Sequence, residues 1–446
     1  MKTHTMHIGL DDTDSTRGGC TTYVAALLVE KLEKLGATFL DYPNLIRLNP
    51  NVPWKTRGNG TLCLRIKYAE GLDDQIKEAA ISLVEEHADL SFKGTDPGIV
   101  FLAKAEVPEE VTVFAKNAIT GIVTLKEAMR LIEEFKGEAL GFNTCRGIIG
   151  ALAAIGETLK DDHTFELIAY RMAENCGSKR KVDEAAIFRM DELTQPYTFN
   201  NVDVEKGRVI ITPRGPDPIL FGVRGETPAI VKKAFGIVKP LEPVERWVIF
   251  RTNQGTDAHL KQVQALNQIK PYNSVIVKGV VSQNPRIIPL RHVIFSIKDE
   301  SGEVDCAAYE PTGALRKVAV KLAVGDSIEA SGAVRKLSQG KPLTVNLEKI
   351  RVFALAPKVN YHNPLCPKCS RRLKSMGKNQ GFRCENCGSR FVGLGKAAVA
   401  MNRELQAGLY VTSTRSQRHL TKPLRRYGLE KCCWTAGSLI EGWHSP

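Results

Sequence analysis

The sequence has no long hydrophobic run. Its 446 residues contain no apolar stretch of the roughly 18 residues that a membrane-spanning helix needs. The amino terminus also lacks the basic-then-apolar pattern of a secretory leader. These absences exclude an integral membrane protein, and they predict a soluble, cytoplasmic protein without a membrane partner.

Cysteine is sparse and shows no disulfide framework. Seven of the eleven cysteines have no regular spacing, which is typical of reduced thiols inside a cell. The other four form a C-x2-C-x14-C-x2-C pattern: Cys366, Cys369, Cys384 and Cys387. Each close pair brings two thiolates to one side of a tight turn, and two such pairs complete a tetrahedral zinc site. Because four thiolates leave no open position, the pattern predicts structural zinc and excludes metal catalysis there.

Acidic residues are scarce at the carboxyl end. From Pro357 onward, 16 Lys and Arg face 4 Asp and Glu, which leaves +12 of the net charge of +13 in this part of the chain. A basic end on an otherwise balanced chain predicts a polyanionic partner, most simply nucleic acid. A membrane surface is the alternative, but this end contains no amphipathic helix with a wide apolar face. We therefore expect the basic end to bind nucleic acid and to be separable from the rest of the chain.

The chain is long enough for about three domains, and its first half alternates strand and helix signals. In order these are strand 7–10, helix 22–35, extended run 45–48, strand 61–67, helix 73–87 and strand 99–102. This β-α-β-β-α-β order is the ferredoxin-like pattern. Further elements are expected as helices near 124–136, 146–158 and 163–176 and a strand at 209–212. We interpret residues 1–240 as an α/β catalytic region of one body or two interleaved lobes.

The chain changes character at residues 270–355. This part contains five short strand-like runs separated by Gly, Asp and Pro: 274–281, 292–298, 304–308, 327–334 and 343–350. A helix at 312–322, after the third run, favours a five-stranded OB-fold barrel over a small SH3-like barrel. Residues 236–243 are expected to be a linker. The prediction is thus a multidomain α/β plus β protein, with a zinc ribbon at 362–398 and a basic tail at 399–446.

The most informative segment of the first half is an acidic loop at the end of its first strand. Asp11, Asp12 and Asp14 place three carboxylates within four positions, followed by small and hydroxyl residues and then a helix. Crowded carboxylates ionise easily only beside a cation. Magnesium is commonly held by one or two carboxylates together with substrate phosphates. The segment predicts a magnesium–phosphate site, and an acidic turn with a capping Asp or Ser is the alternative.

Three further loops carry anion-binding residues. In the first, Arg214 offers a bidentate fork for phosphate, Gly215 allows close backbone approach, and Asp217 offers one more carboxylate. The second places Arg146 just before an apolar helix, and the third places Arg57 in a Gly-rich basic loop at 53–60. A Pro-rich corner, a helix cap and a surface hairpin turn explain the three loops equally well.

Cations and polar residues also gather in stretches suited to nucleic acid. The polar stretch 251–259 and the stretch 286–292 are weak candidates, and the stretch 416–427 is a stronger one because it interleaves cations with an aromatic residue. The predicted nucleic-acid contacts, in the ribbon and this last stretch, are Arg371, Arg372, Lys374, Arg418, Lys422, Arg425 and Arg426. A solvated charged face is the alternative for each stretch.

Taken together, the motifs resemble the archaeal 2-agmatinylcytidine (agmatidine) synthetases of the AUA-reading isoleucine tRNA. The resemblance rests on G-L-D-D-T-D-S-T-R-G-G-C-T-T-Y at 9–23, R-L-N-P-N-V-P-W-K-T-R-G-N-G at 47–60, G-F-N-T-C-R-G at 141–147, P-R-G-P-D-P at 213–218, T-N-Q-G-T-D-A-H-L at 252–260, the four cysteines and R-H-L-T-K-P at 418–423. It spans nearly the whole chain.

The resemblance implies a fold and a reaction. The family joins a kinase-like and a ferredoxin-like domain to an OB domain and a zinc ribbon. It uses ATP to replace the C2 oxo group of the anticodon wobble cytidine with agmatine, so that AUA is read as isoleucine. The resemblance also implies autophosphorylation of a threonine, and we assign this threonine to Thr21. A dication such as agmatine needs a carboxylate- or carbonyl-rich pocket, whose residues the sequence does not identify.

The resemblance also gives roles to the candidate residues. Asp11, Asp12 and Asp14 would hold magnesium with Asp217, while phosphate would be bound by the set Arg57, Arg146, Arg214 and Gly215. No obligate protein partner is expected beside the tRNA and agmatine. A non-catalytic single-strand binder of the OB-and-ribbon type is the main alternative, and a metal-dependent kinase or nuclease acting on another RNA is a second. Neither the binder's fold nor its charge accounts for the acidic loop.

Overall fold

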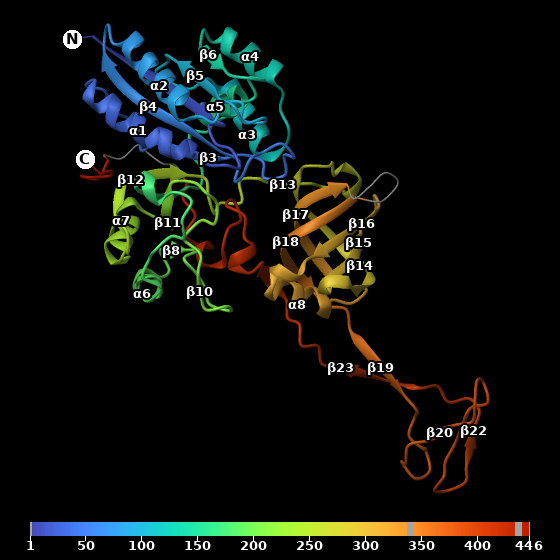
Figure 1. The fold of residues 1–446 in the computed structure, drawn as a ribbon. Coiled ribbons are helices and arrows are strands. Elements are labelled where there is room, and N and C mark those ends of the chain that lie inside the picture. Colours follow the sequence, from blue (N-terminus) through green and yellow to red (C-terminus); the bar gives the residue numbers. More distant parts are fainter. Residues whose placement is uncertain (1, 337–342, 433–438, 446) are drawn as a thin grey trace.

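The computed structural model describes residues 2–336, 343–432 and 439–445. They form an α/β body, a β-barrel beside it and a small ribbon that stands away from both on a two-stranded stalk (Figure 1). No helix in these ranges is both long enough and apolar enough to cross a membrane.

The first half of the body is a β-α-β-β-α-β unit, as the sequence predicts. Its elements are β1 (Thr3–Asp11), α1 (Thr21–Lys34), β3 (Asn44–Arg47), β4 (Gly60–Ala69), α2 (Asp73–His87) and β5 (Gly98–Leu102), with the short β2 (Thr38–Phe39) beside β4. The strands lie in the order β5-β1-β4-β3 and all are antiparallel. This is the ferredoxin-like topology, so that prediction is confirmed for residues 3–102.

A second layer of helices covers the other face of this unit. It is formed by α3 (Glu109–Thr120), α4 (Leu125–Glu134) and α5 (Gly147–Gly156), while β6 (Glu138–Gly141) extends the sheet beside β5. Helix α5 packs directly on β1. The approach is so close that a Cβ at Gly9 would collide with the Ala151 carbonyl. The small residues of α5 therefore bring the first turn of this helix close to the end of β1.

The second half of the body repeats the same topology. Its main elements are β7 (Thr164–Arg171), α6 (Glu184–Thr194), β8 (Thr198–Phe199), β11 (Ile219–Gly225), α7 (Pro228–Ile237) and β12 (Val244–Thr252), with β9 (Val202–Asp203) pairing β10 (Arg208–Val209). The strand order is β12-β7-β11-β8, again antiparallel throughout. Strand β12 pairs in parallel with β3, so the two units share one 10-stranded sheet.

Two predictions for this half are wrong. The expected helix at 163–176 is strand β7, whose eight residues are all buried; a fully buried strand has no alternating pattern that would distinguish it from a helix. The expected linker at 236–243 joins α7 to β12, a strand in the middle of the shared sheet. The α/β region therefore continues past residue 240.

The barrel confirms the OB-fold prediction. Its strands are β14 (Ser274–Ile288), β15 (His292–Lys298), β16 (Glu303–Ala308), β17 (Ser327–Lys336) and β18 (Leu343–Ala354), with α8 (Ala314–Lys321) after the third strand and β13 (Leu260–Gln262) at one edge. The order β14-β15-β16-β18-β17 is closed by pairing of β14 with β17. Valine, isoleucine and leucine from these strands fill the interior.

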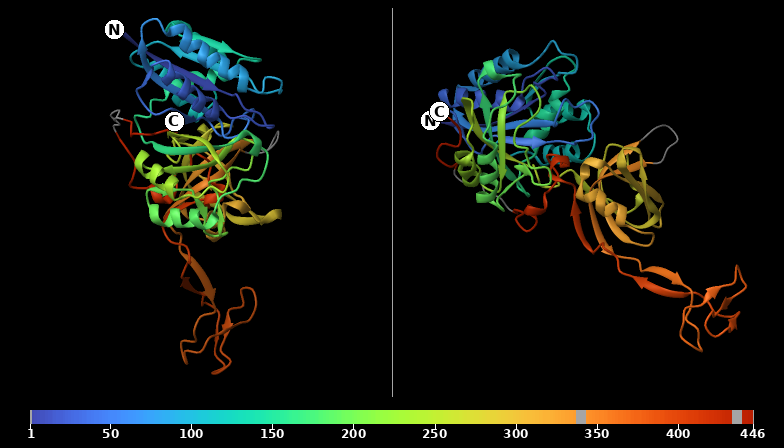
Figure 2. Two further views of the ribbon diagram at one scale, coloured as in Figure 1. Left: turned by 60° about the vertical axis from the view of Figure 1, so that its left-hand side comes forward. Right: turned by 60° about the horizontal axis from the view of Figure 1, so that its bottom comes forward.

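The ribbon is carried by two paired strands, β19 (Lys358–His362) and β23 (Ala397–Met401). At their far end lies a three-stranded sheet of β20 (Lys374–Ser375), β21 (Phe382–Arg383) and β22 (Arg390–Phe391). In each view the ribbon projects beyond the barrel and away from the body (Figures 1 and 2). It makes its own small core from Leu373 and Phe382 beside the cysteines.

Residues 399–446 do not form an independent tail, so that prediction is wrong. Strand β24 (Gly408–Val411) pairs with β18 of the barrel. The following residues, 412–432, which we call the C-terminal segment, run back between the barrel and the body (Figure 2). Near the end of the chain, Trp443 is buried against Phe39 of the first unit. Charge composition alone cannot reveal this return, because it does not show which cations have internal partners.

Candidate functional site

The separately predicted loops meet in one cavity of about 620 Å³ in the body. It lies where the end of β1, the loop before β4, the start of α5 and the loop before β11 come together. Its lining includes every predicted catalytic and phosphate-binding residue: Asp11, Asp12, Asp14, Thr21, Arg57, Arg146, Arg214, Gly215 and Asp217. The convergence of four loops far apart in sequence marks this cavity as the candidate active site.

The carboxylates at the end of β1 are crowded. Gly150 of α5 leaves room for the Asp11 carboxylate, since a Cβ there would collide with Asp11 Oδ2. Burial raises the pKa of Asp11 well above its usual value, and the charges of Asp12 and Asp14 raise it further. Burial likewise raises the pKa of Asp12 to about 6, although the Asp96 N–H donates to Asp12 Oδ2 at 2.9 Å. A divalent cation would relieve this repulsion.

The donor set fits magnesium rather than a closed protein cage. Within the described ranges, only the four ribbon cysteines place three or more ligand atoms within 4.8 Å of one another. Asp11, Asp12 and Asp14 are therefore close but not gathered into a complete site. An ion that keeps several waters and takes other ligands from substrate phosphates suits such an arrangement.

Arg57 ties two of the acidic loops together. Its Nε donates to Asp14 Oδ2 at 2.7 Å, its Nη1 donates to Asp217 Oδ2 at 3.1 Å, and its Nη2 donates to the Gly19 carbonyl at 2.6 Å. Arg180 holds Asp217 from the other side, donating to Asp217 Oδ1 at 3.0 Å. Arg57 thus has internal partners here, and it joins the loop before β4 to the loop before β11.

Two helices present their first turns to the cavity. Neither α1 nor α5 has a side-chain hydrogen bond capping its N-terminus, and residues of both first turns line the cavity. Free N–H groups at helix N-termini favour bound anions. At α5 the first-turn N–H groups donate to backbone carbonyls, including that of Asp96, so the better anion site is the first turn of α1. Thr21 begins α1, and its buried Oγ1 accepts a 3.1 Å hydrogen bond from Thr13 Oγ1.

The remaining predicted residues of the cavity differ in their surroundings. Arg146 lies over the Trp54 ring, with its guanidinium carbon 5.6 Å from the ring centre, and its Nη2 lies 3.7 Å from Asp96 Oδ2. Arg214 lies at the rim, next to Gly215. A half-exposed Trp54 beside a guanidinium offers a flat apolar surface for a planar ring.

Sequence reasoning missed Asp96 and Arg180. Asp96 accepts from the Thr144 N–H at 3.1 Å, and its own N–H and carbonyl bind Asp12 and Gly147, so it joins two site loops. In the sequence, Asp96 stands in a Gly-Thr-Asp-Pro-Gly stretch before a strand. Such stretches are common in ordinary loops, so this one did not indicate a functional residue. Arg180 lies in a basic run that looks like an ordinary solvated surface.

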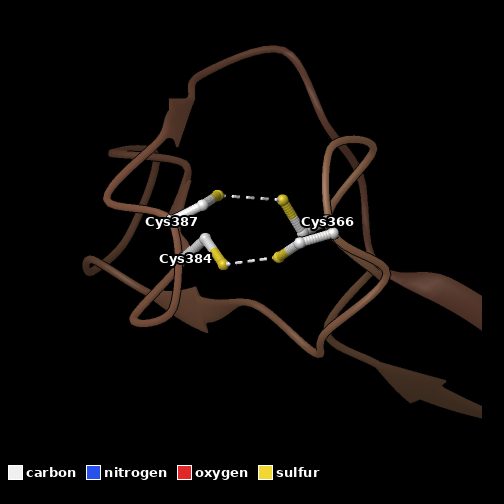
Figure 3. Close-up of side chains that lie close together, drawn as sticks. Cys366, Cys384 and Cys387 are labelled. Carbon is white, nitrogen blue, oxygen red and sulfur yellow. Dashed lines mark hydrogen bonds between the residues drawn. The ribbon is translucent and has the colours of Figure 1, made fainter.

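The four cysteines of the ribbon converge as predicted. Cys366 Sγ lies 3.6 Å from Cys387 Sγ, and Cys369 Sγ lies 3.4 Å from Cys384 Sγ (Figure 3). Each of these contacts joins one cysteine of the first C-x2-C turn to one of the second, so the two turns face each other. Four sulfur atoms within 4.8 Å of one another match a tetrahedral structural zinc site. Arg371, Arg372 and Lys374 lie on the same ribbon, and all three are exposed.

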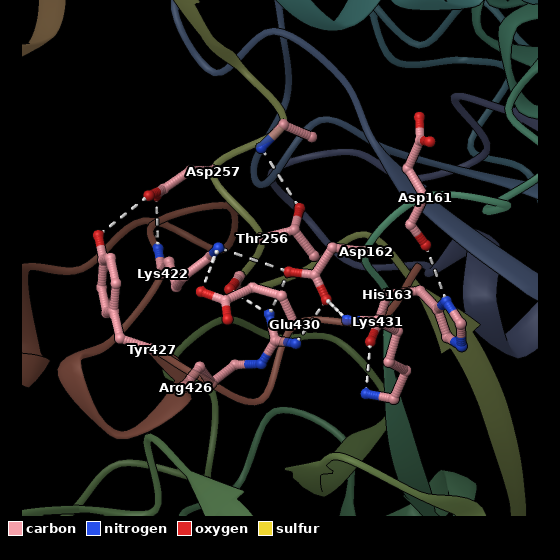
Figure 4. Close-up of polar contacts among 12 residues, drawn as sticks. Asp161, Asp162, His163, Thr256, Asp257, Lys422, Arg426, Tyr427, Glu430 and Lys431 are labelled. Atoms are coloured by element: carbon pink, nitrogen blue, oxygen red, sulfur yellow. Dashed lines mark hydrogen bonds and ion pairs between the residues drawn. The ribbon is translucent and has the colours of Figure 1, made fainter. Parts of the chain in front are cut away.

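The C-terminal segment uses its cations inside the protein. Arg426 is fully buried, with its Nη2 2.8 Å from Asp162 Oδ1 (Figure 4). Its Nε lies 2.5 Å from Glu226 Oε1. The prediction that Arg426 contacts nucleic acid is therefore wrong. Lys422 pairs with Asp162 at 3.6 Å and Arg425 pairs with Asp191 at 2.8 Å.

Other cations of this segment are only partly engaged. Arg418 donates to Asn51 Oδ1 at 2.5 Å, yet its side chain keeps 29% of its surface exposed. Lys422 and Arg425 also retain some exposure, so a nucleic-acid contact by these three residues stays a prediction. The polar stretch 251–259 is buried except near Asp257 and Ala258, so its interpretation as a nucleic-acid contact is wrong.

Comparison with protein-family models gives four matches along the chain. Residues 7–76 match the TiaS TCKD domain, and residues 145–259 match the TiaS FLD domain. Residues 275–353 match an OB-fold nucleic acid binding domain, and residues 363–405 match the TiaS C-terminal zinc ribbon domain. The OB-fold and ribbon predictions are both confirmed.

Similar proteins cover almost the whole chain. The isoleucine-tRNA 2-agmatinylcytidine synthetase TiaS of Methanocaldococcus jannaschii is 42% identical over 94% of this chain and 98% of its own length. That of Pyrococcus horikoshii is 42% identical over 94% of this chain and 96% of its own.

Solved structures agree with this likeness. A complex of TiaS with its isoleucine tRNA and ATP is 40% identical, with a TM-score of 0.86 over 95% of this chain and 97% of that one. A complex of TiaS with the same tRNA, AMPCPP and agmatine is 37% identical, with a TM-score of 0.83 over the same shares.

Proposed function

The chain belongs to the isoleucine-tRNA 2-agmatinylcytidine synthetase family, and on that premise we propose what its site does. It uses ATP to join agmatine to C2 of the wobble cytidine of the AUA-reading isoleucine tRNA. The observation that carries this function is the single cavity in which the acidic loop after β1 meets cations from three other loops. The non-catalytic binder is not favoured, because it has no use for that cavity.

The chemistry needs activation before substitution. The C2 oxygen of cytosine is a poor leaving group, so it first receives a phosphoryl or adenylyl group from ATP. The primary amine of agmatine then attacks C2, the C2–O bond breaks, the oxygen leaves with the phosphate, and the nitrogen loses a proton. Such a reaction depends on positioning and charge stabilisation more than on covalent protein chemistry.

The residues of the cavity suit these tasks. Asp11, Asp12 and Asp14, with Asp217, would hold magnesium, which supplies positive charge beside the ATP phosphates. Phosphate oxygens would be bound by the first turn of α1 and by the set Arg57, Arg146, Arg214 and Gly215. Asp14 and Asp217 accept hydrogen bonds from Arg57 here, so the guanidinium already lies beside the carboxylates that would hold magnesium and beside the proposed place of the phosphate.

Thr21 is proposed as a phosphorylation site. Its hydroxyl lies in the cavity wall between the acidic loop and α1. A hydroxyl in this place lies beside any phosphate bound at the first turn of the helix. Mass analysis of the protein after incubation with ATP checks this assignment, and Thr22 is the neighbouring hydroxyl to be distinguished from it.

The barrel and ribbon would hold the tRNA. The ribbon presents Arg371, Arg372 and Lys374 far from the cavity, at the end of its stalk (Figure 1). Phosphate contacts at this distance fix the orientation of an extended RNA without reading its bases. The wobble base must then leave its stack to reach the cavity. Because its substrate is tRNA, the enzyme is expected to act in the cytoplasm.

The function is tested with unmodified isoleucine tRNA, agmatine and ATP labelled at the α- or γ-phosphate. The expected result is a tRNA nucleoside whose mass gains agmatine and loses water, together with tRNA-dependent ATP breakdown. The two labels show which phosphate activates the base. Absence of both modification and ATP breakdown, with intact tRNA binding, would leave only the binding protein.

A further inference from the structure

Arg47 lies at the end of β3 in the cavity wall, beneath the loop before β4. A Cβ at Gly58 would lie 2.7 Å from Arg47 Nη1, and a Cβ at Gly60 would lie 2.6 Å from the same atom. The two glycines thus leave room for the guanidinium to approach the loop. The Gly-rich loop is therefore shaped around Arg47.

Within the described part of the chain, the Arg47 guanidinium is not paired with a carboxylate at ion-pair distance. Its Nε is buried without a hydrogen bond. Glu166 attracts it from farther away, but that carboxylate accepts hydrogen bonds from Arg224 and Gln254. Burial lowers the pKa of Arg47 to about 10. A desolvated cation without a close counter-charge costs free energy, and in a cavity it indicates an anionic ligand.

The C-terminal segment reaches the same point. A Cβ at Gly58 would lie 2.9 Å from His419 Nε2, so the imidazole and the Arg47 guanidinium are neighbours beneath one residue. The His419 Nδ1 lies 3.1 Å from Arg224 Nη2 and 2.9 Å from Gln254 Oε1. Burial, with Arg47, Arg224 and Lys55, lowers the pKa of His419 well below its usual value. The ring is therefore neutral and adds no like charge against Arg47.

The polar stretch after β12 connects these two residues. Asn253 Oδ1 accepts from the Arg47 N–H at 2.8 Å, and Asn253 Nδ2 donates to the Arg47 carbonyl at 3.0 Å. Gln254 contacts the His419 ring, and the Gly255 N–H donates to the His419 carbonyl at 2.8 Å. Three consecutive residues thus fix Arg47 and His419 relative to each other.

We propose that Arg47 binds a phosphate group of the substrate and that His419, from the C-terminal segment, is the residue that positions its guanidinium. The proposal rests on the proposed function, which brings two sources of phosphate to this cavity. One is the triphosphate of ATP, and the other is the RNA backbone beside the target base. Both present the same oxygens to a guanidinium.

The direct test replaces Arg47 and measures each ligand alone. Affinity for ATP is measured without tRNA, and affinity for tRNA is measured without ATP at two salt concentrations. Arg47→Met is expected to weaken one of them about tenfold or more, because charge-assisted hydrogen bonds are lost, and Arg47→Lys is expected to recover part of the loss. Arg246→Met, a partly buried arginine paired with Glu30 outside the cavity, is the matched control.

The positioning role is tested by coupling. His419→Leu is expected to weaken the same ligand as Arg47→Met, and the double variant is expected to be no weaker than Arg47→Met alone. A purely structural role for His419 would give losses that add. Gly58→Ala is the second test, because its Cβ displaces both side chains and leaves their charge intact.

The outcomes separate the possibilities. Loss of ATP affinity assigns the phosphate to the nucleotide, and loss of tRNA affinity with a shallower salt dependence assigns it to the RNA backbone. Unchanged affinity for both ligands in a folded Arg47→Met protein overturns the proposal, and additive losses overturn the role of His419. Since neither measurement uses agmatine, failure of the wild-type protein to modify tRNA would overturn the proposed function alone.

Discussion

Asp12 occupies a left-handed backbone conformation, with φ of 59°, directly after the last residue of β1. Asparagine and aspartate tolerate this conformation better than other side chains, apart from glycine. The Asp12 carboxylate accepts hydrogen bonds from the Asp96 N–H and from Thr56 Oγ1. An asparagine oxygen can accept one of these bonds in the same backbone conformation, so charge can be removed here without changing the backbone.

Asp12→Asn is therefore expected to abolish ATP turnover while the protein stays folded. In the proposed function, magnesium held at the acidic loop would need the negative charge of Asp12, whereas the amide of asparagine keeps the shape of the side chain. We expect turnover to fall by about 100-fold or more and the thermal midpoint to stay near that of the wild type. Turnover is measured at limiting magnesium, and wild-type turnover of this variant under that condition would contradict the assignment.

The residues of the cavity were predictable where chemistry is concentrated in a short motif. Asp11, Asp12 and Asp14 adjoin one another in sequence, and Arg214 and Asp217 share one loop. Arg47 and His419 form a unit only through folding, so no spacing in the sequence joins them. Arg426 was misassigned because a basic run gives a charge, whereas its carboxylate partners lie far away in the chain.

One of the contacts between the C-terminal segment and the barrel is made by Glu348, a buried residue in the middle of β18. Glu348 of this strand accepts from Thr421 Oγ1 at 2.6 Å and lies 3.1 Å from His259 Nε2. Burial by itself raises the pKa of Glu348, but His259, Arg418 and Thr421 outweigh it and hold the pKa at about 2. The ionised carboxylate therefore stabilises the docked segment.

This element predicts a pH dependence of stability. The folded protein holds the pKa of Glu348 below the usual 4.5, so the unfolded state binds more protons between these values and stability rises with pH there. The contribution is complete above about pH 4.5 and is lost as pH falls toward 2. Glu348→Gln is expected to flatten this part of the stability profile, measured by urea unfolding from about pH 3 to 6. Glu300→Gln, at a barrel turn away from this contact, is the control, and an equal slope in both variants would contradict the prediction.

The zinc ribbon is an element whose loss should remain local. Cys384→Ser is expected to reduce zinc to well below one per chain and to weaken tRNA binding, because a four-thiolate site that loses a ligand no longer holds the fold together. ATP affinity is expected to stay within about twofold of the wild type, since the ribbon projects away from the cavity. Zinc content and both affinities are measured on one preparation. Full zinc content would show that the ligand set is wrong.

A secondary-structure element can be predicted from the sequence when its own residues carry the whole signal. The five barrel strands and the paired cysteines carry their signals locally, and both predictions are confirmed. Strand β7 was mistaken for a helix because burial on both faces removes its alternation. Residues 236–243 looked like a linker because no local signal shows that β12 pairs with β3 in the middle of a sheet.

The whole molecule is held together by a chain that leaves the body and returns to it. Two ferredoxin-like units share one sheet, the barrel follows, and the ribbon extends on its stalk before the C-terminal segment comes back (Figures 1 and 2). A cut before Pro357 would remove the ribbon and the C-terminal segment together. The charge count suggests such a cut, but it would leave Asp162 and Glu226 without Arg426. Uncompensated buried charges are strongly destabilising.

We therefore expect two deletions to behave differently. In the first, the chain ends at residue 356. In the second, residues 363–396 are replaced by an Asn-Gly turn between His362 and Ala397, which face each other as paired residues of the stalk. The second deletion removes eight Lys and Arg and one Glu while it keeps β24 and the whole C-terminal segment.

The ribbon deletion is expected to keep the thermal midpoint of the body and its ATP affinity, and to lose tRNA affinity with a shallower salt dependence, because phosphate contacts are removed. The chain ending at residue 356 is expected to lose thermal stability, because the ion pairs of Arg426 are gone, and to lose ATP affinity as the body that forms the cavity is destabilised. Thermal unfolding, ATP titration and tRNA binding at two salt concentrations compare the two proteins with the full chain. Equal stability and equal ATP affinity in the two deletions would show that the C-terminal segment is not part of the catalytic body. The basic end would then serve the tRNA alone, as its charge first suggested.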